Sequence, residues 1–232
     1  EVAADMARTA VSALKISVSC LQGDVPELAA SVREKEEKTD YYEDILGTYL
    51  IKLSEKQISA SDSAEAAKLL KMIGDFERIS DHAVNLLESA EEMREKGLTF
   101  TEAATSELDV LTSAVKEILD LSLAAFLSDD LKAASMVEPL EQVIDLLKEQ
   151  MRTRHILRMQ QKACSIEAGF IWSDLLTSLE RTSDHCSNIA GCVIDMAHHS
   201  MSLHESLRSV RNDSEDFREN FRAYAQKYHF VS

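Results

Sequence analysis

Apolar residues recur along the chain at spacings of three and four residues, which is the pattern of one buried face on an α-helix. The pattern predicts seven helices, over about residues 2–22, 27–56, 62–96, 101–127, 128–163, 167–199 and 203–228. Pro139 lies inside the fifth range and predicts either a bend or the first turn of a helix there. We therefore expect an all-α protein.

Polar residues and a glycine mark the expected ends of these helices. Asp62 or Ser63 is expected to cap the third helix, and Gly97 to end it. Thr101 is expected to open the fourth helix, and residues 128–129 to start the fifth. These positions divide the chain at about residue 100.

An internal repeat crosses this division. Residues 77–85 and 180–188 share Glu, Arg, Ser, Asp, His and Asn at matched positions, 103 residues apart. A second match pairs residues 36–40 with 141–145, at an offset of 105. Repeats of this length indicate repeated structural units. The chain is thus predicted to form two repeated three-helix bundles, over 1–98 and 101–200, followed by a C-terminal amphipathic helix over 203–230.

Aromatic residues form a stripe on this last helix. Phe217, Phe221, Tyr224 and Tyr228 follow one another at spacings of four, three and four. Such a stripe is more often a packing face than a ligand site. We expect it to pack onto the bundle or onto a second copy of the chain, which would make the protein a homodimer.

Charge and composition narrow the class of protein. The chain carries 41 acidic and 25 basic residues, a formal net charge of -16. Nucleic acids and anionic membranes are therefore poor partners, because phosphate backbones are bound by clustered Lys and Arg. Only 6 Gly and 2 Pro occur, which disfavours many short strands and tight turns. No apolar run reaches the roughly 18 residues of a membrane-spanning helix, so we expect a soluble chain without membrane insertion.

The cysteines point to a reducing compartment. Cys20, Cys164, Cys186 and Cys192 form no CxxC pair and are too sparse for a disulfide framework. We expect reduced thiols, with Cys186 and Cys192 buried as small apolar residues.

Four ExxxD pairs carry the candidate chemistry. Residues four apart lie on the same face of a helix, so each pair places two carboxylates side by side, and this face points away from the apolar one. The pairs fall at matched places in the two repeats: Glu36 with Asp40, Glu77 with Asp81, Glu141 with Asp145, and Glu180 with Asp184. Two facing helices would bring four carboxylates together, and a cation would relieve their repulsion. Oxygen donors suit magnesium, calcium or manganese, and carboxylate-rich bundles also accept iron or zinc.

Other polar residues of the repeated segment are assigned to supporting roles. His82 and His185 border the apolar face, so we expect helix contacts or hydrogen bonds rather than metal ligation. Asn85 and Asn188 are expected nearer the carboxylates, and Arg78 and Arg181 are expected to pair with neighbouring acids. The ferritin-like di-iron motif needs a His three residues after a Glu, whereas the spacing here is five, which disfavours an oxidase of that type.

Phosphate-binding loops and hydrolase motifs are absent from the sequence. It has no GxxxxGK[ST], no GxGxxG and no GxSxG motif. An anion could still bind to a metal cluster through metal–oxygen contacts. The motifs of the sequence therefore offer little further candidate chemistry.

The repeated ExxxD pairs and the ER-x-x-DH-x-x-N block resemble the PhoU family of phosphate-transport regulators. A longer segment is similar to the PhoU-like cytoplasmic domain at the C-terminus of bacterial sodium/phosphate cotransporters. The residues that carry this likeness are His155-Ile156-Leu157-Arg158, Cys164, Gly169, Leu179-Glu180-Arg181, Asp184-His185-Cys186 and Asn188-Ile189-Ala190. The resemblance covers about residues 1–200. The chain begins at Glu1 rather than Met, as a segment of a longer protein would.

The resemblance implies iron or zinc clusters held by the eight carboxylates named above, on the surface of two three-helix bundles. It also implies regulation of phosphate uptake rather than catalysis, through contact with the membrane transporter portion of the same or another chain. The place implied is the cytoplasm, at the inner face of the bacterial cell membrane. One departure is that Ser80 and Ser183 stand where the family often has Gly.

Three alternatives stay open at this point. The chain could be a free-standing PhoU-type regulator instead of a cotransporter domain. It could be a metal-dependent hydrolase or oxidase that uses the same carboxylates. It could also be an interaction module without metal, in which the acidic faces bind a basic partner.

Overall fold

Seven α-helices make up the part of the fold that the structure describes. The computed structural model describes residues 1–21, 23, 26–56, 58–200 and 203–230, and the side chains of these residues outside 198–214. The helices are α1 (Val2–Cys20), α2 (Pro26–Ser54), α3 (Ala60–Glu95), α4 (Glu102–Ser128), α5 (Leu131–Gln160), α6 (Ile166–Ser200) and α7 (Leu203–Lys227). The described residues contain no strand, which confirms the all-α prediction.

The ends of α3 and the start of α4 depend on local hydrogen bonds. Ser59 caps α3, because its side chain accepts a hydrogen bond from the Asp62 backbone N–H at 3.0 Å. The prediction that Asp62 or Ser63 is the cap was therefore wrong, since both lie inside the first helical turn. Gly97 follows α3 with φ at +61°, a left-handed conformation that favours glycine. Thr101 caps α4 as predicted.

The start of α5 differs from both sequence expectations. Asp130 is the N-cap, and its carboxylate accepts hydrogen bonds from the backbone N–H groups of Lys132 and Ala133 at 3.0 Å. The start predicted at residues 128–129 was therefore early by about two residues. Pro139 lies buried inside α5 rather than in its first turn, because the Asp130 cap starts the helix two turns earlier.

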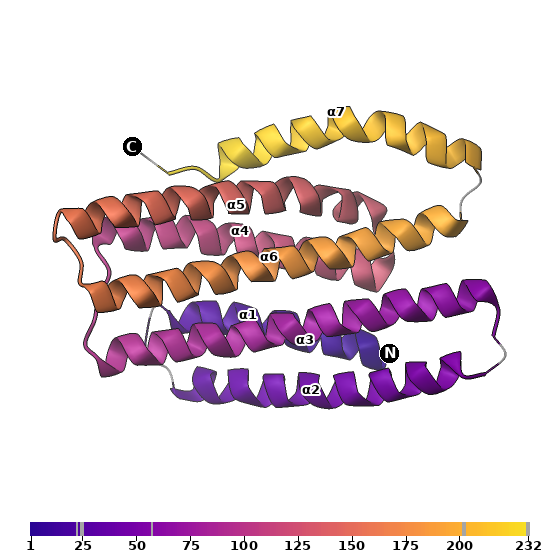
Figure 1. The fold of residues 1–232 in the computed structure, drawn as a ribbon, viewed down its shortest axis with the longest axis horizontal. Coiled ribbons are helices and arrows are strands. Elements are labelled where there is room, and N and C mark those ends of the chain that lie inside the picture. Colours follow the sequence, from indigo (N-terminus) through magenta and orange to yellow (C-terminus); the bar gives the residue numbers. More distant parts are fainter. Residues whose placement is uncertain (22, 24–25, 57, 201–202, 231–232) are drawn as a thin grey trace.

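The helices pack in two groups that meet along two long helices (Figure 1). Helices α1, α2 and α3 contact one another, and so do α4, α5 and α6. The two groups meet mainly through α3 against α6, with a smaller contact of α1 against α4. Helix α7 lies along α5 on the outer side of the second group. The face that α3 and α6 share is therefore the centre of the molecule.

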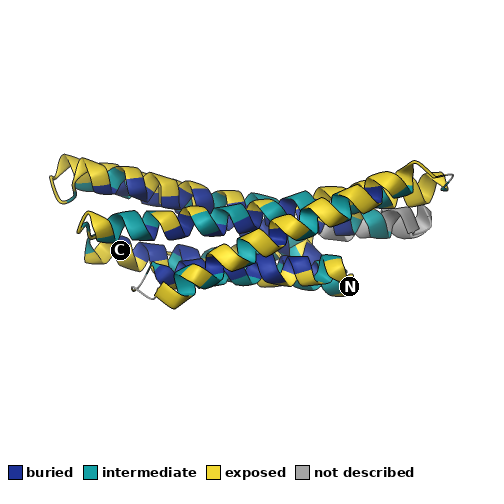
Figure 2. Ribbon diagram, turned by 90° about the horizontal axis from the view of Figure 1, so that it is seen from below, coloured by how far each residue is buried: buried dark blue, intermediate teal, exposed yellow. Residues whose placement is uncertain are grey.

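Buried side chains form a continuous stripe along the helices (Figure 2). The largest fully buried ones include Phe76 on α3, Trp172 on α6, and Met6 and Leu14 on α1. Each fully buried Leu, Met or Phe contributes about 1.5–3 kcal/mol through removal of apolar surface from water. Exposed residues recur along the opposite sides of the helices and continue to the helix ends.

Helix α7 packs onto the bundle through its aromatic stripe. Tyr224 is buried, and Phe221 and Tyr228 pack against the core. Glu117 on α4 accepts hydrogen bonds from the Tyr228 hydroxyl and, at 2.6 Å, from the Lys227 ammonium group. The packing role predicted for the stripe is confirmed.

Two further expectations concern the membrane and the thiols. None of the described helices is both long and apolar enough to cross a membrane. Cys186 and Cys192 are buried, as predicted, and burial raises the pKa of the Cys186 thiol to about 12. Both are unlinked thiols, as is Cys164 near the start of α6.

Candidate functional site

The first carboxylate cluster lies between α2 and α3. The ExxxD spacing places Glu36 and Asp40 on one face of α2, and Glu77 and Asp81 on one face of α3. One carboxylate oxygen from each of Glu36, Asp40 and Asp81 lies within 4.8 Å of the others. Glu77 is close enough to Asp81 and Asp40 to feel their charges. The four residues predicted for this cluster therefore come together.

Burial and the charges of neighbouring carboxylates both act on the acidic groups of this cluster. Burial raises the pKa of Glu77 to about 7, and the negative charge of Asp81 adds to the rise. Burial and neighbouring carboxylates raise the pKa of Glu36 and of Asp40 as well. A cation that binds among carboxylates with raised pKa values stabilises their charged form.

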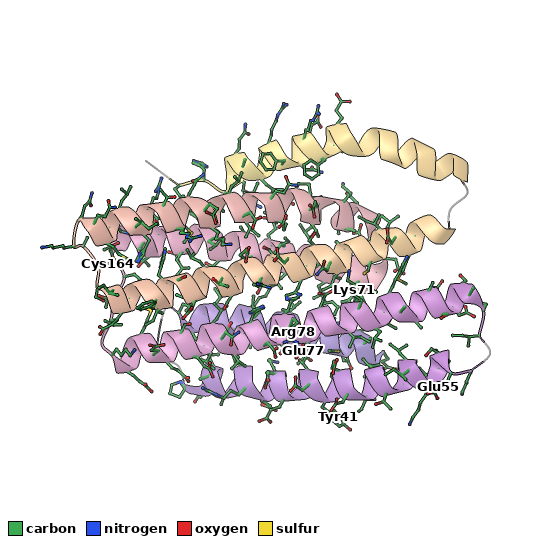
Figure 3. The ribbon with its side chains drawn as sticks, viewed as in Figure 1. Tyr41, Glu55, Lys71, Glu77, Arg78 and Cys164 are labelled. Carbon is green, nitrogen blue, oxygen red and sulfur yellow. The ribbon has the colours of Figure 1, made fainter. Side chains whose placement is uncertain are left out.

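Arg78 brings a positive charge of the chain itself to the first cluster. Its guanidinium lies 3.4 Å from the Glu77 carboxylate and donates a hydrogen bond of 3.1 Å to Asp81. Figure 3 labels Glu77 and Arg78 midway along α3. The Arg78 side chain is 62% exposed, so water screens this pairing. The predicted pairing of Arg78 with neighbouring acids is confirmed.

The second carboxylate cluster lies between α5 and α6. Here Glu141 and Asp145 on α5 meet Glu180 and Asp184 on α6, and each interacts electrostatically with at least one residue of the other helix. Burial raises the pKa of Glu141 to about 7, followed by the charge of Asp145. The Asp145 Oδ1 atom is buried and has no hydrogen-bond partner among the described residues.

A lysine distinguishes the second cluster from the first. The Lys148 ammonium group donates a hydrogen bond of 2.8 Å to Glu180 across the α5–α6 contact. The matched position in the first repeat, 105 residues earlier, is Glu43. The second cluster therefore contains a partly buried cation of the chain where the first repeat has another acid.

The two histidines form hydrogen bonds at the contact between α3 and α6. The imidazole of His185 lies 2.8 Å from the Asp75 carboxylate, atom Nδ1 to Oδ1. The His82 and His185 rings lie 5.7 Å apart, and burial followed by the charge of His185 lowers the pKa of His82 to about 4. The predicted role in hydrogen bonding is confirmed.

The side chains of the two asparagines form their hydrogen bonds at the α3–α6 contact. Asn188 donates to Asp75 Oδ1 at 3.2 Å, and Asn85 lies 3.4 Å from the Nδ1 atom of His82. Both face the α3–α6 contact because they follow the histidines by three residues on the same helix face. The clusters instead occupy the faces turned to α2 and α5.

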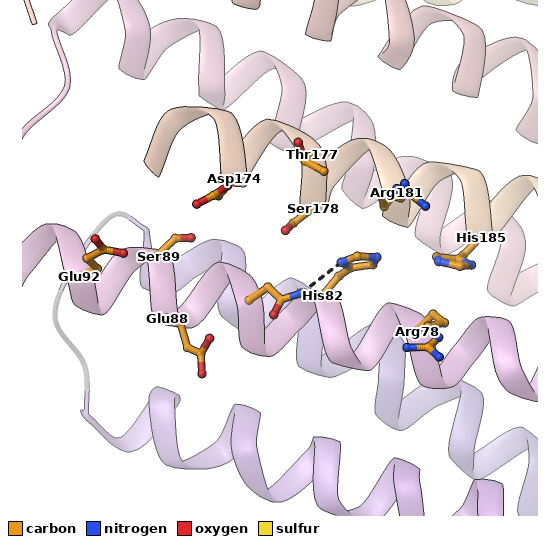
Figure 4. Close-up of a pocket in the computed structure, with 11 residues that line it drawn as sticks. Arg78, His82, Glu88, Ser89, Glu92, Asp174, Thr177, Ser178, Arg181 and His185 are labelled. Atoms are coloured by element: carbon orange, nitrogen blue, oxygen red, sulfur yellow. Dashed lines mark hydrogen bonds between the residues drawn. The ribbon is translucent and has the colours of Figure 1, made fainter. Parts of the chain in front are cut away.

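A groove of about 580 Å³ runs along the α3–α6 contact. Figure 4 shows its charge distribution: Arg78, His82, Arg181 and His185 lie at one end, and Glu88, Glu92 and Asp174 at the other. Thr177 and Ser178 lie between these ends, and Ser89 lies at the acidic end. The groove therefore separates the two clusters with a surface of mixed charge.

Two buried acids were missed from the sequence. Asp75 is 7% exposed and joins His185 to Asn188, while Glu107 on α4 is 4% exposed. Glu107 accepts two hydrogen bonds of 2.9 Å from Arg158 and lies 3.3 Å from Arg154. The sequence did contain a signal for the burial of these two acids, because each falls within an apolar stripe of its helix.

The PhoU domain family matches residues 3–90 and 108–193, which is more than half of the chain. The chain is 28% identical over 196 residues to the phosphate-specific transport system accessory protein PhoU homolog of Pseudomonas aeruginosa, covering 82% of this chain and 78% of that protein. It is 28% identical over 147 residues to PhoU homolog 1 of Thermotoga maritima, covering 63% of this chain and 62% of the relative. The chain thus spans less than two thirds of that relative.

A longer relative and two solved structures extend the comparison. A Salmonella typhimurium protein named for inorganic phosphate export is 24% identical over 152 residues, which cover 63% of this chain and 27% of that protein. The crystal structure of PhoU from Pseudomonas aeruginosa has a TM-score of 0.71 at 25% identity and covers 85% of this chain and 91% of that one. PhoU from Streptococcus pneumoniae has a TM-score of 0.69 at 18% identity, covers 84% of this chain and 91% of that one, and shares the fold.

Proposed function

The chain belongs to the PhoU domain family, and from this premise we propose that it is a PhoU-type regulator of phosphate transport. The observation that carries the proposal is the extent of the family match, which includes all four ExxxD pairs in both repeats. Relatives that match most of the chain are named as accessory proteins of a phosphate-specific transport system.

A free-standing regulator is better supported than a domain joined to a transporter. The PhoU protein of Pseudomonas aeruginosa matches this chain along most of both lengths. The phosphate export relative, in which the match takes up 27% of the protein, supports the attached arrangement. We therefore reverse the preference drawn from the sequence and propose the free-standing arrangement first.

We further propose that the two clusters bind metal ions. The donor chemistry fits: three carboxylate oxygens lie within 4.8 Å of one another in the first cluster. In the second cluster, Asp145 Oδ1 has no hydrogen-bond partner within the described part of the chain. Carboxylate oxygens suit hard cations such as manganese and magnesium, and iron or zinc are also compatible. The residues that would hold the ions are Glu36, Asp40, Glu77, Asp81, Glu141, Asp145, Glu180 and Asp184.

Bound cations would supply positive charge to an acidic surface. The metal proposal is tested by elemental analysis of the purified chain and of the variant Glu77→Ala with Asp81→Ala. Bound iron, zinc or manganese should fall in the variant. Equal metal content in both proteins would reject the first cluster as a site.

The role that we propose is regulatory rather than catalytic, with a membrane transport protein at the cytoplasmic face of the cell membrane as the partner. The competing function is a metal-dependent hydrolase or oxidase. Turnover of phosphoesters or oxygen that disappears in Asp184→Ala would favour the enzyme.

The regulatory function is tested in a bacterial strain that lacks its own PhoU-type regulator. Expression of the chain should restore control of phosphate uptake, measured with radiolabelled phosphate in phosphate-rich and phosphate-poor medium. A matched strain expresses the Asp40→Asn, Asp81→Asn variant at the same level. Uptake that is unchanged by the wild-type chain would contradict the proposed function.

A further inference from the structure

A second pocket, of about 490 Å³, lies between α5 and α6. Its polar lining consists of Lys148, Arg152, His155, Ser173 and Thr177. No acidic residue lines it among those that the structure describes. The Thr177 hydroxyl donates to the Ser173 backbone carbonyl at 2.8 Å. Lys148, Arg152 and the Ser173 hydroxyl are the other donors, and they stand out in a chain whose net charge is -16, because such donors bind oxyanions through charge-assisted hydrogen bonds.

Two ring nitrogens beside this pocket lack partners. His155 is 7% exposed and Trp172 is 1% exposed, and both line the pocket. The Nε2 atom of His155 and the Nε1 atom of Trp172 have no hydrogen-bond partner among the described residues. An indole N–H can only donate, so buried donors of this kind are satisfied only by an acceptor.

The walls of the pocket are held in place by the residues behind them. The His155 ring stacks on Trp172 at a centroid distance of 5.6 Å, and the Arg158 guanidinium lies 5.6 Å from the same indole. Glu107 in turn fixes Arg158 through two hydrogen bonds. A Cβ atom at Gly169 would lie 3.1 Å from His155 Nε2. A larger residue at this position would therefore crowd the imidazole, whereas glycine leaves room for it. The side chains are thus ordered around the pocket.

The matched positions of the first repeat lack this chemistry. With the offsets of the two sequence matches, Lys148, Arg152 and His155 correspond to Glu43, Gly47 and Leu50, and Trp172, Ser173 and Thr177 correspond to Leu69, Leu70 and Gly74. The correspondence holds in space, because a Cβ atom at Gly47 would lie 3.9 Å from Leu70. At these matched positions, the second repeat therefore has cations and hydroxyl groups that the first repeat lacks.

We infer that this pocket binds inorganic phosphate. The shared chemistry is that of a tetrahedral oxyanion, which accepts hydrogen bonds from Arg152, Lys148 and the hydroxyl group of Ser173. The choice of phosphate over other oxyanions rests on the proposed function in phosphate transport. Lys148 also contacts Glu180, so the pocket adjoins the second carboxylate cluster.

Isothermal titration of inorganic phosphate into the full chain tests the inference. Metals are first removed with a chelator and dialysis, so that phosphate bound through a metal does not contribute. We expect saturable binding at one site, weaker sulfate binding at equal ionic strength, and an affinity about tenfold lower in Arg152→Gln. The matched control, Lys132→Gln, removes one exposed cation from the same helix and should bind phosphate as the wild type does.

Four results would overturn the inference: no saturable binding to the wild-type chain, equal affinity in Arg152→Gln, equal loss in Lys132→Gln, or sulfate bound as tightly as phosphate. A lipid headgroup presents the same oxyanion, so vesicles of phosphatidylglycerol and phosphatidylcholine form a separate arm. Vesicle binding that depends on Arg152, without binding of free phosphate, would also overturn it.

The inference can fail separately from the proposed function. If the chain controls uptake in the regulator-deficient strain but binds no phosphate, the pocket assignment alone is wrong. If it binds phosphate through Arg152 but does not alter uptake, the proposed function alone is wrong.

Discussion

The two halves of the molecule place the same carboxylate pairs at matched positions, but they surround them differently. In the first half, three carboxylates converge within 4.8 Å, and the positive charge comes from the exposed side chain of Arg78. In the second half, the largely buried Lys148 donates directly to Glu180. One cluster is thus open to an external cation, whereas the other already contains a cation of the chain.

The two halves also differ in the residues that lie behind the second cluster. Glu107 and Arg158 form a buried ion pair in the second half, whereas the position matched to Arg158 in the first half is Leu53. A repeated motif therefore fixes where the carboxylates lie, while residues outside the motif decide their charge balance. The two clusters are expected to differ in affinity and in their response to mutation.

The largest expected effect comes from breaking the buried ion pair of the second half. The change Glu107→Ala leaves the buried guanidinium of Arg158 without its carboxylate, and we expect the free energy of unfolding to fall by about 3–5 kcal/mol. Urea unfolding followed by circular dichroism measures this loss.

The control for this prediction makes the second half resemble the first. Glu107→Leu together with Arg158→Leu removes both charges, as at Leu53, and should recover most of the stability. A double variant as unstable as Glu107→Ala would show that the charges themselves stabilise the fold.

The next effect concerns metal affinity. Asp81→Asn should weaken manganese binding by about tenfold or more, because it removes one of three converging carboxylates. Asp184→Asn, the matched change, should have a smaller effect, since Lys148 already offsets charge in that cluster. Isothermal titration with manganese measures both, and equal losses would remove the proposed difference between the clusters.

A third effect is the pH dependence of stability without metal. The pKa of Glu77 is raised from 4.5 to about 7 in the folded chain. The stability that the protonated Glu77 carboxyl contributes to folding is therefore complete below pH 4.5 and is lost as the pH rises to about 7. Glu77→Gln should therefore stabilise the chain at pH 8 by about 1 kcal/mol, after allowance for solvent screening, and leave it unchanged at pH 4.

Glu141→Gln provides the matched measurement in the second half, where burial raises the pKa of Glu141 to about 7 as well. Its gain at pH 8 should be at least as large, because Arg78 lowers the pKa of Glu77, whereas the neighbouring charges that act most strongly on Glu141 are those of carboxylates. Thermal unfolding at both pH values, with chelator present, gives the comparison. A loss of stability at pH 8 in either variant would contradict the sign.

The smallest effect is expected from the exposed arginine of the first half. Arg78→Gln should lower the free energy of unfolding at pH 8 by about 0.5 kcal/mol or less, since exposed ion pairs contribute little. It should also raise the pKa of Glu77 further, which can be followed by NMR titration of the carboxyl carbon. A pKa that stays constant would show that Arg78 does not relieve the cluster.

Periodicity and spacing predicted most of the helices and the composition of both clusters. The prediction worked because residues four apart share a helix face whatever the helix packs against. Local capping was harder: Ser59 took the place expected for Asp62 or Ser63, because several polar residues nearby could each accept the same backbone hydrogen bond.

The buried polar contacts were beyond the reach of the sequence. His185 meets Asp75 from a distance of 110 residues, and Arg158 meets Glu107 from 51. Such partners depend on which helices pack against each other and on how each helix is rotated about its own axis. A helical wheel gives the angle of a residue but not the identity of the neighbouring helix.

The sequence by itself determined an all-α repeat with paired carboxylates, because helix periodicity and ExxxD spacing are local properties of the chain. Only the tertiary structure decided that Lys148 neutralises one cluster, that α3 and α6 form the central contact, and that cations and hydroxyl groups surround a pocket in one repeat. Each of these depends on contacts between helices, which local periodicity does not specify.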